Sequence, residues 1–189
     1  MIPRCLVLLM AIACGEGPQG SVIVDDSDPQ GSDPGPVVAE SLIPTTLCIN
    51  ELMVQSDGGW SDETGAFPDW IELYNGSSAP LSLEGFVLTD TPDAPGEPLD
   101  PSLVIPAKGY LVLAADGLPE LGPTHLPFSL SADGESLGLF QADGGGEILN
   151  FGTVEADFSW AREPDCCADI PGCVSQVWQG TPASSNGAR

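Results

Sequence analysis

Short apolar runs recur along most of this chain and are separated by turn residues. From residue 45 onward they include TLCINELMV, DWIELYN, LSLEGFVLT, YLVLAA and ESLGLFQ. Runs of strand length at a spacing of about 8–12 residues are typical of an all-β sandwich or barrel. The Asn-Gly and Asp-Gly pairs between the runs favour the positive φ angles of tight hairpin turns. No long stretch has a helical period, so the pattern predicts an all-β domain over residues 45–189.

The run DWIELYN shows the strand alternation most clearly. A period of two residues places Ile71 and Leu73 on one face of the strand and Trp70, Glu72 and Tyr74 on the other. We therefore expect Ile71 and Leu73 in the core. Two outcomes remain open for Glu72, which either faces water or accepts hydrogen bonds beneath a loop that covers the second face.

The first residues of the chain have a different character. One arginine precedes an apolar run that is too short to span a bilayer but suits a secretory signal peptide. Ala11–Cys14 resembles the lipobox of bacterial lipoproteins, in which the cysteine receives a diacylglycerol and becomes the new N-terminus. We predict a lipoprotein signal peptide at residues 1–13 and lipidation of Cys14, with Gly15 favouring the outer membrane; an ordinary secretory signal is the alternative.

The composition of residues 14–44 predicts a linker. This segment contains no aromatic and no basic residue and is rich in Gly, Pro, Ser and Asp. Such a composition buries too little apolar area to offset the entropy lost on ordering, so we expect a disordered acidic tether. A flexible coil of this length spans roughly 30 Å, enough to hold a small domain away from a membrane surface.

Acidic residues dominate the charge of the chain. Aspartate and glutamate number 28, lysine and arginine 4, and the formal net charge is -24. A surface this negative repels nucleic acid phosphates and attracts cations or basic partners. The composition therefore excludes a nucleic acid partner.

The cysteines predict two disulfides. Apart from Cys14 and the leader, the chain contains four: Cys48, Cys166, Cys167 and Cys173. An even number of cysteines in an exported protein indicates disulfide pairing. Adjacent cysteines bridge each other only with backbone strain, so we expect Cys48 to pair with one of the adjacent two and Cys173 with the other. A tetrathiolate zinc site is the alternative, although the spacing lacks paired C-x-x-C motifs.

Several motifs occur together in a characteristic order. INELMV is followed by DWIELYN, LSLEGFVLTD and IPAKGYLVLAA, and then by PFSLSADGESLGLF, FSWAREPD and GTPASSNG. Over about residues 46–187 the chain resembles the lamin tail domain as it occurs in bacterial surface proteins. The resemblance implies an immunoglobulin-like β-sandwich. It also implies an extracellular accessory or attachment module, because the coiled-coil rod of animal lamins is missing here and their nuclear partners do not suit an acidic exported chain.

Catalysis has little support in the sequence. The single histidine, His125, lies in GPTHLPFSL, and the chain has no G-x-S-x-G nucleophile motif, P-loop or dinucleotide fingerprint. We therefore expect no enzymatic activity and commit to no cofactor.

Calcium is the metal that the acidic loops suggest. Acidic residues crowd two long loops, and carboxylate oxygens are the ligands that calcium prefers. Neither loop fits the EF-hand pattern, so a solvated acidic rim is the alternative. The candidates in the first loop are Asp57, Asp62, Glu63 and Asp69, and those in the second are Asp90, Asp93, Glu97 and Asp100.

These expectations define one function and two alternatives. The sequence predicts a non-enzymatic, lipid-anchored module, exposed on a bacterial envelope, that binds an unidentified surface protein or glycan in adhesion or as a scaffold. A calcium-dependent carbohydrate- or protein-binding module is the second hypothesis. An uncharacterised hydrolase is the third.

Lipidation is directly testable. Radiolabelled fatty acid should be incorporated into the wild-type protein and not into Cys14→Ser, because the thiol is the acceptor. Gel autoradiography of both proteins measures this, and equal labelling would contradict the assignment of Cys14.

Overall fold

The computed structural model describes residues 47–94, 96–142, 144–167 and 173–184. The expected signal peptide at 1–13, Cys14 and the linker at 14–44 lie outside these residues. No helix in the described part of the chain has both the length and the hydropathy to cross a membrane.

The described residues form antiparallel sheets, which confirms the all-β, immunoglobulin-like sandwich. A five-stranded sheet has the order β10-β9-β1-β2-β6, a three-stranded sheet the order β4-β7-β8, and β3 pairs with β5. The strands are β1 (Leu47–Met53), β2 (Trp70–Asn75), β3 (Leu81–Ser82), β4 (Phe86–Thr89), β5 (Val104–Ile105), β6 (Gly109–Ala114), β7 (Glu135–Gln141), β8 (Gly146–Phe151), β9 (Phe158–Arg162) and β10 (Val174–Trp178), and one 3-10 helix, η1, spans Pro119–Leu121.

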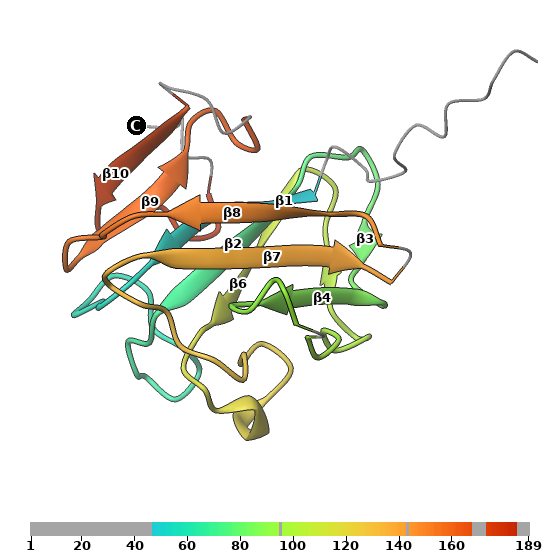
Figure 1. The fold of residues 1–189 in the computed structure, drawn as a ribbon, viewed down its shortest axis with the longest axis horizontal. Helices are drawn as coiled ribbons and strands as arrows, with labels where there is room; N and C mark the ends of the chain where they lie inside the picture. The colour runs from blue at the N-terminus through green and yellow to red at the C-terminus, as the bar shows by residue number, and fades with distance from the viewer. Residues whose placement is uncertain (1–46, 95, 143, 168–172, 185–189) are drawn as a thin grey trace, which may run out of the picture. The chain divides into compact units, whose positions relative to one another are not determined.

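The two larger sheets pack face to face around the core. In Figure 1, β4, β7 and β8 lie across β1, β2 and β6. Ile71 and Leu73 are fully buried in this core, as the alternation in DWIELYN predicts. Apolar side chains from both sheets fill the space between them, among them Ile49, Leu52, Leu113, Leu137, Leu139 and Leu149.

A β-bulge in β1 separates core from outer-face residues. Ile49 lies opposite Leu73 and Glu51 opposite Glu72, so Asn50 is an extra residue in β1. The bulge allows Ile49 and Leu52, three residues apart, both to reach the core. Glu51 consequently lies on the outer face of the five-stranded sheet.

Both expected disulfides are present. Cys48 pairs with Cys166 and Cys167 with Cys173, with Cα–Cα distances of 5.7 and 5.9 Å. The first joins β1 to the turn after β9, across a sequence separation of 118 residues, whereas the second closes a separation of 6. The adjacent cysteines thus connect the residues after β9 to β1 and to Cys173, the residue directly before β10.

The two bridges should differ in their contribution to stability. Loop-closure entropy grows with loop length, so Cys48→Ala/Cys166→Ala should lower the free energy of unfolding by about 4–5 kcal/mol. The matched double variant Cys167→Ala/Cys173→Ala should lower it by about 2 kcal/mol. Urea denaturation measures both values. Equal losses, or a larger loss from the short bridge, would contradict this ranking.

Candidate functional site

Two glutamates face each other on the outer side of the five-stranded sheet. Glu51 of β1 lies opposite Glu72 of β2, and neither has exposed surface. Removing a carboxylate from water is costly unless hydrogen bonds replace the water. The residues that cover this face must therefore supply donors.

The C-terminal residues supply these donors. The backbone N–H and hydroxyl of Thr181 donate to Glu51 over 2.9–3.1 Å, and the Ser159 hydroxyl donates to the same carboxylate. The N–H of Ala183 donates to Glu72 over 2.6 Å. These hydrogen bonds hold the segment after β10 against the outer face of the five-stranded sheet.

The turn after β9 completes this polar network. The Asn50 side chain donates to Glu72 over 3.0 Å and to Asp165 over 3.1 Å, and accepts the N–H of Cys166 over 3.0 Å. The hydroxyl of Tyr110 donates to Asp165 over 2.8 Å. Glu72 therefore accepts hydrogen bonds beneath a covering segment and does not face water.

The environment of Glu72 changes its proton affinity. Burial raises the pKa of Glu72 to about 8, and the nearby charges of Glu51 and Asp165 act in the same direction, against the hydrogen bonds from Asn50 and Ala183. A carboxyl group with such a pKa can act as an acid or base in an enzyme. Here the C-terminal segment covers it and the network holds it, so the arrangement is structural.

The four calcium candidates of the first loop do not come together. Asp69 accepts the N–H of Gln55 over 2.7 Å, and burial raises the pKa of Asp69. Asp57 is exposed, and its N–H donates to Asp157. Asp62 and Glu63 instead lie beside His125, which sequence reasoning did not connect with them.

His125 lies between two carboxylates. Its Nδ1 is 2.8 Å from Asp116 Oδ2 and its Nε2 is 3.0 Å from Glu63 Oε1, and its side chain is fully buried. Burial alone would lower the pKa of His125, but the hydrogen bonds to Asp116 and Glu63 outweigh burial and leave that pKa raised. With Asp62, this cluster joins the loop after β1 to the loop after β6.

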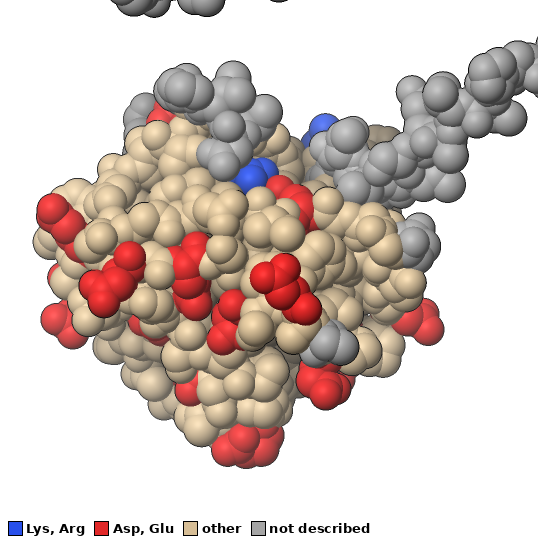
Figure 2. Space-filling model, in the orientation of Figure 1, with Lys and Arg blue, Asp and Glu red and all other residues tan. Residues whose placement is uncertain are grey.

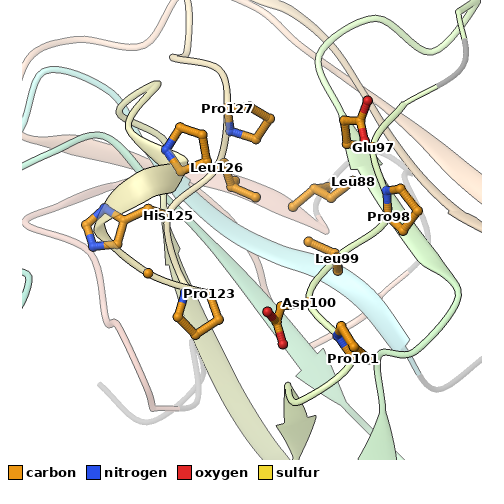
Figure 3. Close-up of a pocket in the computed structure, with 12 residues that line it drawn as sticks. Leu88, Glu97, Pro98, Leu99, Asp100, Pro101, Pro123, His125, Leu126 and Pro127 are labelled. Carbon is orange, nitrogen blue, oxygen red and sulfur yellow. The ribbon is translucent and has the colours of Figure 1, made fainter.

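A cavity of about 760 Å³ opens beside this cluster. Figure 3 shows Leu88, Leu99 and Leu126 gathered at its centre, while the imidazole of His125 points away from them. Glu97 and Asp100 come from the loop between β4 and β5. Five prolines line the cavity: Pro98, Pro101, Pro119, Pro123 and Pro127.

One rim carboxylate is held in its charged form. Both the side-chain hydroxyl and the backbone N–H of Ser102 donate to Asp100, over 2.6 and 2.8 Å. Both hydrogen bonds lower the pKa of Asp100, and the one from the Ser102 hydroxyl has the larger effect. The cavity therefore combines an apolar centre with negative charge at its edge.

Acidic side chains also dominate the surface around this site. Figure 2 shows them spread over the face that β4, β7 and β8 form, with few basic atoms among them. Within the described residues, Lys108 and Arg162 are the only lysine and arginine. Of the acids expected in the second loop, Glu97 and Asp100 line the cavity, whereas Asp90 and Asp93 do not.

Comparison with known proteins yields one match. The family model described as Lamin Tail Domain matches residues 44–155. Neither the curated proteins nor the solved structures include a match to the chain. The matched residues contain β1 to β8, whereas the residues that cover Glu51 and Glu72 lie after the match.

The raised pKa of Glu72 predicts a specific pH dependence. The pKa of Glu72 in the folded protein, about 8, exceeds its ordinary value of 4.5. The contribution of Glu72 to the free energy of unfolding is therefore full below pH 4.5 and is lost as the pH rises through 8. Glu72→Gln cannot titrate, so its free energy of unfolding should fall less steeply between pH 5 and pH 8, by up to about 1.4 kcal/mol per pH unit. Urea denaturation at several pH values measures the slopes.

The exposed Glu84 provides a matched control. Glu84→Gln should retain the wild-type slope, because its carboxylate faces water in both states. Parallel curves for wild type and Glu72→Gln would show that Glu72 keeps an ordinary pKa in the folded protein.

Proposed function

This chain belongs to the lamin tail domain family, and we propose that its immunoglobulin-like sandwich is a non-enzymatic, envelope-anchored module that binds cationic polypeptides in adhesion or as a scaffold. The observation that carries the proposal is the apolar, proline-lined cavity with carboxylates at its edge.

The disulfides support export. Bridges of this kind persist in oxidising compartments and are rare in the cytosol. Cys48–Cys166 and Cys167–Cys173 therefore indicate an oxidising, extracellular environment. The predicted signal peptide and lipobox at Cys14 extend this to anchoring by a lipid, with the predicted linker at 14–44 as the tether.

The charge distribution supports a cationic partner. Arg162 is nearly buried and pairs with Glu147 over 3.1 Å, and the ammonium group of Lys108 donates to the carbonyl of Gly76. The acidic groups on the surface therefore greatly outnumber the basic ones available to neutralise them. Such a field speeds the approach of basic partners and repels acidic ones.

The cavity supports a polypeptide rather than a small ion as the partner. Its volume of about 760 Å³ lies in the range of ligand-binding pockets. Prolines fix the backbone φ angle, so a cavity lined by them needs little ordering on binding. Leu88, Leu99 and Leu126 belong to the buried core, so an apolar side chain of the partner would pack over the small surface that they leave open. A neighbouring lysine or arginine would pair with Glu97 or Asp100.

A non-catalytic role agrees with the chemistry of the described residues. His125 is held between Asp116 and Glu63, and its imidazole is turned away from the cavity. Glu72, the carboxyl group with the strongly raised pKa, is covered by the C-terminal segment. Neither group is placed to reach a ligand in the cavity.

Peptide binding tests the proposal. A peptide of alternating leucine and lysine should bind the full chain, more tightly at low salt than at high salt, and a leucine–glutamate counterpart should not. Glu97→Gln should weaken binding by about two- to fivefold, because it removes one exposed charge pair. Isothermal titration calorimetry measures these affinities.

Glu155→Gln is the control, since this exposed glutamate carries the same charge but does not line the cavity. Equal weakening by both substitutions would place the binding outside the cavity. Binding that requires calcium and is abolished by a chelator would favour the calcium-dependent alternative, and binding of both peptides would contradict a charge-selective site.

A further inference from the structure

We propose that Asp62, Asp116 and His125 form a binding site for a divalent transition-metal ion of the zinc class. One oxygen of each carboxylate and one ring nitrogen of His125 lie within 4.8 Å of one another. Ligands at metal distances of about 2.0–2.2 Å cannot be further apart than about 4.4 Å, so small side-chain movements would bring all three onto one ion.

The position of His125 indicates which nitrogen would bind. Metal-ligating histidines commonly donate their second ring N–H to a carboxylate, which fixes the tautomer and the orientation of the ring. Glu63 is placed for this role, 3.0 Å from Nε2. Nδ1 then faces Asp116 Oδ2 at 2.8 Å and is the nitrogen available to the ion.

The carboxylates are also held in place. Asp62 Oδ1 accepts the N–H and hydroxyl of Thr64 and the N–H of Ala66, over 2.7–3.0 Å, which leaves Oδ2 available. Asp116 Oδ1 accepts the N–H of Leu118 over 3.0 Å, and its Oδ2 faces His125. In each aspartate, one carboxylate oxygen thus accepts hydrogen bonds from the protein and the other is available to the ion.

The charge of the cluster favours a divalent ion. Asp62 is buried and the side chain of Asp116 is only 13% exposed, whereas Glu63 is 58% exposed. Even a protonated His125 leaves three carboxylates balanced by one positive charge. Binding of the ion would displace the Nδ1 proton to solvent, so that two positive charges replace one.

The donor set selects the class of ion. Calcium takes six to eight oxygen ligands, and this cluster offers two carboxylates and one imidazole. Imidazole suits zinc and its neighbours in the first transition row. Calcium and zinc are therefore distinguishable at this site. The four cysteines within the described residues are bonded in disulfides and do not compete as thiolates.

Zinc titration of the full chain, with its disulfides intact, tests the proposal. Calorimetry should find one zinc ion per chain, retained in a hundred-fold excess of calcium. Asp116→Asn keeps an acceptor for Leu118 but removes the carboxylate, and should weaken zinc binding by at least about tenfold. His125→Gln should do the same. Asp57→Asn, a control in the same loop but outside the cluster, should not.

Because His125 is the only histidine in the chain, its imidazole resonances report on the site directly. Zinc should shift the Nδ1 resonance of the wild-type protein in proportion to occupancy, and this readout does not depend on the folding of a variant. Failure of zinc to bind, an unshifted Nδ1 resonance, displacement by calcium, or equal affinity of Asp116→Asn and wild type would overturn the proposal.

Discussion

Two glutamates without access to water constrain the whole domain. Glu51 and Glu72 lie opposite each other on the outer face of the five-stranded sheet, and burial of carboxyl groups is tolerated only when hydrogen bonds replace their hydration. Thr181 and Ala183 provide those bonds from the end of the described chain. The domain is therefore incomplete at residue 155, where the family match ends, because the cover of this sheet follows it.

This cover separates architecture from function. One face of the five-stranded sheet packs against β4, β7 and β8, and the other carries the C-terminal segment and the Cys48–Cys166 bridge. In the proposed function, the loops and the acidic surface bind the partner. His125 connects the two features found there, since it lines the proline-rich cavity while its ring turns toward Asp116 and Glu63. An ion held by that ring would stiffen one wall of the cavity.

Sequence reasoning succeeded where local pattern decides the outcome. The alternation in DWIELYN placed Ile71 and Leu73 in the core because a strand has only two faces. It left Glu72 open, because its hydrogen-bond partners Asn50 and Ala183 lie 22 and 111 positions away along the chain. The bulge at Asn50 and the approach of Asp116 to His125 and Asp62 were missed, since each depends on how distant segments pack. The spacing of Ile49 and Leu52, three residues apart within a strand, was the available signal for the bulge.

Amide hydrogen exchange at Thr181 and Ala183 tests most directly whether the buried glutamates fasten the C-terminal segment. Both amides donate to carboxylates beneath the segment, so they should exchange as slowly as those of the central strands β1 and β2, although they belong to no strand. Exchange at the rate of an exposed loop would show that Glu51 and Glu72 are open to water, and would contradict the account.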